Sequence, residues 1–141
     1  MDTLYEATAT TTGGRAGHVQ SSDGLIDMKL ELPEELGGKG GDYTNPEQLF
    51  AAGYSACFGS ALDAVAKMHK VKLENPEVTA TIGIGRHPEE DGFLLNAVLD
   101  VYLPGIDLET AEMLVEEAHE LCPYSRATRD NIDVTLNLLE D

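Results

Sequence analysis

The chain has 141 residues, a length at which one domain can bury a substantial hydrophobic core. Its 26 acidic residues against nine basic ones give a formal net charge of −17, and a field of that sign repels nucleic acid and anionic membranes. The first residues lack a basic stretch followed by an apolar run, and no apolar segment is expected to reach the roughly 20 residues that span a bilayer. We therefore expect a cytoplasmic protein with a single domain at residues 1–141 and with neither nucleic acid nor membrane as a partner.

The first third of the chain is predicted to form an antiparallel meander. Stretches with strand composition are separated by two glycine turns, Gly13-Gly14 and Asp23-Gly24. The strands are expected at residues 4–12, 15–21 and 25–32.

A long helix is predicted from Pro46 to about Lys70, after a glycine-rich loop at residues 36–43. Asn45 can cap it, Pro46 suits its first position, and Glu47 faces the positive end of the helix dipole. Apolar residues cover most of its circumference, which predicts burial in the middle of the domain or against a second subunit.

The rest of the chain is predicted to form two strands, then a helix and a last strand. They are expected at residues 78–84, 93–103, 108–121 and 132–138, with Pro123 breaking or restarting the helix. The whole chain is therefore predicted to have an α+β fold, in which antiparallel sheets pack on two main helices.

The two cysteines are the residues most informative about function. Cys57 lies deep inside the long helix, and Cys122 follows the second helix. In a two-thiol redox enzyme, one thiolate attacks an oxidant and the other closes a disulfide on the oxidised first sulfur. A static disulfide and two unrelated core residues are the alternatives. Because permanent disulfides are uncommon in the cytoplasm, cycling thiols are favoured over a static bond.

A buried thiol needs a nearby cation to ionise, because burial raises its pKa. Arg15 follows the Gly13-Gly14 turn and can supply a guanidinium, which Glu47 can orient. Alternatively, Arg15 is an ordinary surface charge on a hairpin, and Glu47 is an ordinary acid in the first turn of a helix. Ten residues separate Glu47 from Cys57, about 15 Å of helical rise, so the helix bends near Gly53 or the site combines two subunits.

Cys122 precedes Pro123, where a new helix start can lower the thiol pKa and suit a resolving role. The alternative is a core residue at a helix end. His119-x-x-Cys122 has the spacing of metal ligands, but the sequence offers no Cys-x-x-Cys or His cluster to complete a site, so no metal is expected.

Five segments share a pattern with one known family: Thr12–Arg15, Glu35–Gly38, Thr44–Phe58, Cys122–Arg129 and Asn131–Val134. They resemble the organic hydroperoxide resistance (Ohr) proteins of the OsmC/Ohr superfamily, nearly end to end. The resemblance implies an intertwined homodimer with its sites at the subunit interface. It also implies a peroxidase without haem or metal that reduces organic hydroperoxides, including those of fatty acids, better than hydrogen peroxide.

The resemblance assigns Cys57 as the peroxidatic cysteine, Cys122 as the resolving cysteine, and Arg15 and Glu47 as the activating pair. It implies electrons from a dihydrolipoamide-type dithiol on a lipoylated protein, with no cofactor bound. One departure is His18, where relatives often have Arg.

In the resulting mechanism, Phe50, Phe58 and Tyr124 line a channel for the organic tail of the substrate, or else simply pack in the core. The alternative functions are a non-catalytic thiol redox sensor and a general OsmC-type osmotic and oxidative stress protein.

Overall fold

The computed structural model describes residues 1–140 and divides the chain into two compact units, Met1–Leu49 and Phe50–Asp141. A single domain over residues 1–141 stays a prediction. The elements are β1 (Ala9–Thr12), the 3-10 turn η1 (Gly14–Ala16), β2 (His18–Ser21), β3 (Asp27–Lys29), the 3-10 turn η2 (Glu34–Leu36), α1 (Pro46–Met68), β4 (Glu77–Arg86), β5 (Phe93–Tyr102), α2 (Leu108–Leu121), α3 (Pro123–Thr128) and β6 (Asp133–Leu139).

The first unit contains the predicted meander, with β1, β2 and β3 paired antiparallel in chain order. The strands are shorter than predicted, and Arg15 lies in η1 rather than in a strand. Gly13 has a positive φ of 84°, and a Cβ on Gly17 would lie 1.7 Å from the carbonyl oxygen of Thr12. Glycine is therefore required at both ends of the turn that presents Arg15.

The start of α1 is fastened to this meander. As predicted, Asn45 caps the helix, since its Oδ1 accepts a 2.8 Å hydrogen bond from the backbone N–H of Gln48. Thr44, just before the cap, forms an isolated parallel bridge with Leu30, beyond the end of β3. The bridge at Thr44 connects the first helical turn, which carries Glu47, to the strands of the first unit.

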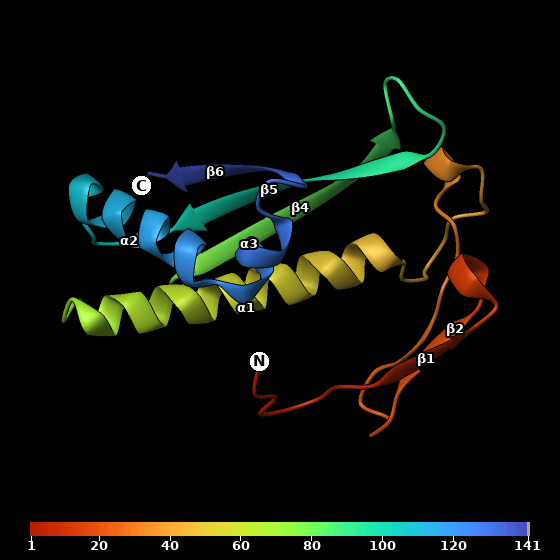
Figure 1. Cartoon of the computed structure of the whole chain (residues 1–141), viewed down its shortest axis with the longest axis horizontal. Helices are drawn as coiled ribbons and strands as arrows, with labels where there is room; N and C mark the ends of the chain where they lie inside the picture. The colour runs from red at the N-terminus through yellow and green to blue at the C-terminus, as the bar shows by residue number, and fades with distance from the viewer. Residues whose placement is uncertain (141) are drawn as a thin grey trace. The chain divides into compact units, whose positions relative to one another are not determined.

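The second unit contains the sheet β4-β5-β6, whose strands run side by side (Figure 1). The α+β class is as predicted, and β4 pairs antiparallel with β5. The predicted antiparallel pairing has one exception, because β6 pairs parallel with β5. The chain returns from the end of β5 through α2 and α3 before β6 begins, and a helical crossover of this kind leads to a parallel neighbour.

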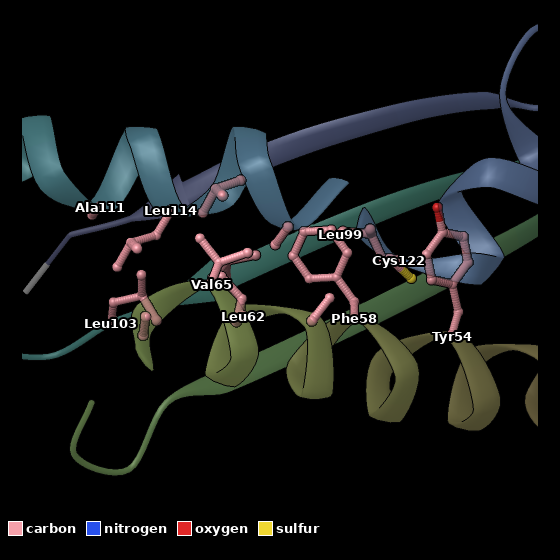
Figure 2. Close-up of a cluster of buried hydrophobic side chains, with 14 of the residues drawn as sticks. Tyr54, Phe58, Leu62, Val65, Leu99, Leu103, Ala111, Leu114 and Cys122 are labelled. Atoms are coloured by element: carbon pink, nitrogen blue, oxygen red, sulfur yellow. The ribbon is translucent and has the colours of Figure 1, made fainter. Parts of the chain in front are cut away.

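The core of the second unit lies between one face of this sheet and the helices α1 and α2 (Figure 2). Alternate residues of each strand face it, while their neighbours point to the opposite, more polar face. Its completely buried aromatic and aliphatic side chains come from α1, β5 and α2: Tyr54, Phe58, Leu62, Leu99, Val101 and Leu114.

Helix α1 is buried on one face rather than around its circumference. Small residues on the other face are exposed: Ala52, Ala56 and Ser60. Within one chain, α1 is therefore not buried in the middle of the domain. Among the described residues, α1 also has the length and apolar composition of a membrane span, contrary to the expectation from sequence. That is weak support for membrane insertion, because a helix that supplies a protein core passes the same test.

Truncating the core should destabilise the protein strongly. Phe58→Ala removes a ring with no exposed surface and should lower the free energy of unfolding by about 3–5 kcal/mol. Phe93→Ala is the matched control, since that ring is 55% exposed and lies under the guanidinium of Arg86 in a cation–π arrangement; we expect a loss of about 1 kcal/mol or less. Urea denaturation of both variants measures the difference, and equal losses would contradict the assigned core.

Candidate active site

Arg15 and Glu47 form a bidentate ion pair within the first unit. Arg15 Nη1 donates to Glu47 Oε2 at 2.8 Å, and Arg15 Nη2 donates to Glu47 Oε1 at 2.7 Å. These hydrogen bonds are the main reason that the pKa of Glu47 lies below its ordinary value, and they raise the pKa of Arg15. The pair therefore stays ionised at neutral pH, and the carboxylate fixes the plane of the guanidinium, as Glu47 was predicted to do.

Cys57 and Cys122 are neighbours within the second unit. Their Sγ atoms lie 3.6 Å apart, and both are free thiols. Cys122 is completely buried at the junction where α2 ends and α3 begins, while Cys57, on α1, is partly exposed. A disulfide needs a separation of about 2.05 Å, so a small movement joins the two sulfurs. The interpretation as two unrelated core residues does not account for this proximity.

The surroundings of Cys57 within this unit do not activate its thiol. Burial raises the pKa of Cys57, a hydrogen bond from the backbone N–H of Tyr124 lowers it, and the Cys122 thiol raises it again. The net effect is an increase, so these neighbours leave Cys57 protonated at neutral pH. A thiolate nucleophile at this position requires an additional positive charge.

Three aromatic rings gather beside the thiols. The ring centroid of Tyr124 lies 6.3 Å from that of Phe50 and 5.9 Å from that of Tyr54. Gly53 allows this packing, because a Cβ there would lie 3.2 Å from the Tyr124 ring. Phe58, by contrast, is completely buried in the core.

The α1 helix continues through Gly53 without a break (Figure 1). The bend near Gly53, one alternative from the sequence, is therefore absent from α1. Gly53 instead allows the Tyr124 ring to pack closely against the helix. The structure brings Arg15 to Glu47 and Cys57 to Cys122. These two pairs belong to different units.

A buried hydrogen-bond network beside the cysteines was missed by sequence reasoning. Tyr54, Ser125 and Thr128 are buried, and the Tyr54 hydroxyl lies 2.8 Å from Ser125 Oγ and 3.2 Å from Thr128 Oγ1. His119, considered as a metal ligand, places Nδ1 2.8 Å from Ser125 Oγ. The sequence did contain one signal for this network, which is Tyr54 on the apolar face of a helix. A buried phenol needs a polar partner, so its position predicts a buried hydrogen bond.

No group of three or more metal-ligating side chains occurs among residues 1–140. His18, the departure from the family pattern, forms a hydrogen bond with Asp27 in the first unit.

The fold and the paired sulfurs define a class: an α+β protein that holds two free thiols within reach of a disulfide. A family described as OsmC-like protein matches residues 38–137. The chain is 54% identical over 136 residues to the organic hydroperoxide resistance protein of Xanthomonas axonopodis pv. citri, with 96% of this chain and 94% of that protein covered. The chain therefore belongs to the OsmC-like family, among its organic hydroperoxide resistance proteins.

Solved structures agree with this assignment. The organic hydroperoxide resistance protein of Elizabethkingia anophelis, with thiocyanate bound, is 50% identical, covers 100% of both chains and has a TM-score of 0.94. OhrB of Bacillus subtilis is 43% identical, with a TM-score of 0.90 and coverage of 97% of this chain and 100% of that one.

Proposed function

We propose that this protein is a cysteine-based peroxidase that detoxifies organic hydroperoxides, including those of lipids. The observation that carries the proposal is the 3.6 Å approach of Cys57 Sγ and Cys122 Sγ, in a chain whose relatives are named for resistance to organic hydroperoxides. Two thiols at this distance can cycle between reduced and disulfide states, which supports a peroxidase cycle without haem or metal.

Peroxide reduction begins at the Cys57 thiolate, with Arg15 as the activating cation. The thiolate attacks the outer oxygen of ROOH and the O–O bond breaks, leaving the sulfur as a sulfenic acid after the alkoxide takes up a proton and departs as ROH. The guanidinium favours the thiolate and can donate hydrogen bonds to the peroxide oxygens. Its bidentate pairing with Glu47 keeps that donor geometry fixed.

Disulfide formation and reduction complete the cycle. The Cys122 thiol attacks the Cys57 sulfenic acid, the S–O bond breaks, and one water leaves as the disulfide forms. A dihydrolipoamide-type dithiol, carried on a lipoylated protein, then exchanges with the disulfide, so that its own two thiols become oxidised and both protein thiols are regenerated. No cofactor remains bound to the chain in this cycle.

The assembly proposed for this chemistry is a cytoplasmic homodimer whose sites lie at the subunit interface. The exposed small-residue face of α1 supports a partner subunit, because a helix of such apolar composition is usually covered. The net charge of −17 supports the absence of nucleic acid and anionic membranes as partners.

Aromatic side chains beside the thiols favour substrates with an organic tail. Tyr124 is 41% exposed and packs with Phe50, so both rings can contact an apolar tail while the peroxide group faces Cys57. Phe58 was a third candidate, and its complete burial favours the packing role for that ring.

A steady-state assay tests the proposed function. We expect tert-butyl and fatty-acid hydroperoxides to be turned over faster than hydrogen peroxide, and dihydrolipoamide to support turnover better than thioredoxin. A redox sensor would form the Cys57–Cys122 disulfide but sustain no turnover with any dithiol. A disulfide that persists under excess dithiol, with loss of stability when it is finally reduced, would indicate a structural bond.

A further inference from the structure

A buried chain of hydrogen bonds links three helices beside the thiol pair. The Tyr54 hydroxyl on α1 lies 2.8 Å from Ser125 Oγ on α3, and Ser125 Oγ lies 2.8 Å from His119 Nδ1 on α2. Figure 2 shows Tyr54 and Cys122 adjacent, with the tyrosine hydroxyl directed away from its own helix. Tyr54 and Ser125 have no exposed surface, so their hydroxyls depend on these partners instead of water.

The spacing places this chain alongside the sulfur contact. Tyr54 precedes Cys57 by three residues on α1, and Cys122 precedes Ser125 by three residues at the start of α3. Residues three apart share a helical face, so the Tyr54–Ser125 contact is a second link between the same two elements. Loss of the Tyr54–Ser125 hydrogen bond is therefore expected to change the distance and orientation of the two sulfurs.

His119 extends the link across the junction that carries Cys122. It occupies the last turn of α2, and its Nδ1 reaches Ser125 in the first turn of α3. The guanidinium of Arg129 donates to the backbone carbonyl of His119 at 2.8 Å. Burial lowers the pKa of His119, so a neutral imidazole takes part in the chain. Polar contacts consequently hold the backbone on both sides of Cys122, and the Tyr54–Ser125 hydrogen bond among them is buried.

We propose that Tyr54, Ser125 and His119 form a positioning clamp that holds Cys122 ready to close on oxidised Cys57. This deepens the proposed function and rests on it, because the clamp acts on the resolving step of that cycle. None of the three residues is assigned contact with the peroxide, and all act through Cys122.

The clamp matters because the Cys57 sulfenic acid has two possible fates. Attack by Cys122 gives the recyclable disulfide, whereas a second peroxide oxidises the sulfur to a sulfinic acid that a dithiol does not restore. The first rate depends on the position of Cys122 and the second on peroxide concentration. Since a displacement of about 1 Å can cost on the order of 100-fold in such a step, a loosened clamp favours irreversible oxidation.

Tyr54→Phe and Ser125→Ala test the clamp, because each removes a hydroxyl and little else. We expect the peroxide concentration at which half of the Cys57 becomes sulfinic acid, measured by mass spectrometry, to fall about 10-fold or more. Disulfide closure driven by diamide, a thiol oxidant that is itself reduced to a hydrazine, should slow by a similar factor. Tyr5→Phe is the matched control, since that side chain is 80% exposed, and it should change neither value.

A double-mutant cycle separates positioning from general destabilisation. With Cys122→Ser as background, Tyr54→Phe should leave both the first peroxide reaction and the sulfinic acid yield unchanged, because the residue through which the clamp acts is gone. An effect of equal size in that background would overturn the clamp, as would unchanged closure in both hydroxyl variants. The diamide measurement decides the matter even if the wild-type protein fails to turn over any hydroperoxide, which would refute only the proposed function.

Discussion

Replacing Cys57 by serine is expected to reduce hydroperoxide turnover to the uncatalysed level, a loss on the order of 10³-fold or more. The reason is that serine offers a neutral hydroxyl where the reaction needs a thiolate, and the remaining thiol, Cys122, has no exposed surface from which to meet a peroxide. The change is nearly isosteric at a partly exposed position of α1, so the fold should survive. Steady-state consumption of tert-butyl hydroperoxide with a dithiol donor measures the effect.

Cys122→Ser is the matched control, because it makes the same atomic change at the other sulfur. That variant should consume the first equivalent of peroxide at close to the wild-type rate and then accumulate over-oxidised Cys57, since nothing closes the disulfide. Stopped-flow peroxide consumption and mass spectrometry distinguish the two variants. If Cys122→Ser lost the first equivalent while Cys57→Ser kept it, the two roles would be reversed.

Much of the fold follows from local signals in the sequence. The cap at Asn45, the glycine turns and the restart at Pro123 depend on neighbouring residues. Both helix starts lie where those signals placed them, while the strands beside the glycine turns are shorter than predicted. The parallel pairing of β6 with β5 did not follow, because it depends on the path of the chain through two helices and not on the composition of either strand. The alternation along β6 predicts which face is buried but is the same for both directions.

The candidate site was predictable where chemistry restricts the residue type. Two cysteines and few cations left a short set of candidates, and the Arg15–Glu47 pairing matched the chemistry expected of them. The network around Ser125 was not predictable, because serine, histidine and tyrosine are ordinary residues whose meaning comes from contact across three helices. Burial of Phe58 was equally invisible, since a phenylalanine in an apolar helix suits a core and a substrate channel alike.

Arg15→Ala is expected to slow the reaction of Cys57 with organic hydroperoxide at neutral pH by about 10²- to 10³-fold. A nearby cation favours the thiolate, so its removal should move the midpoint of the pH–rate profile upward by about one unit or more. The deficit should therefore be largest near neutral pH and should narrow in alkali, where the thiol ionises without help. Any deficit left in alkali measures the lost hydrogen bonds to the peroxide oxygens. Rates at several pH values, with Arg86→Ala as the control for loss of an arginine, test both effects.

Mixed dimers test whether Arg15 acts across the subunit interface. At neutral pH, Arg15→Ala alone should keep at most about 1% of wild-type turnover and Cys57→Ser alone essentially none. A dimer with one subunit of each contains one intact site if that site combines Arg15 and Cys57 from different chains. Random pairing of equal amounts, achieved by co-expression, would then recover about a quarter of wild-type turnover. A site formed within one chain would recover none, because the two changes would occupy separate sites. An Arg15→Ala variant with an unchanged rate and an unchanged pH profile would remove this guanidinium from the chemistry, and the cation required by Cys57 would have to come from another residue.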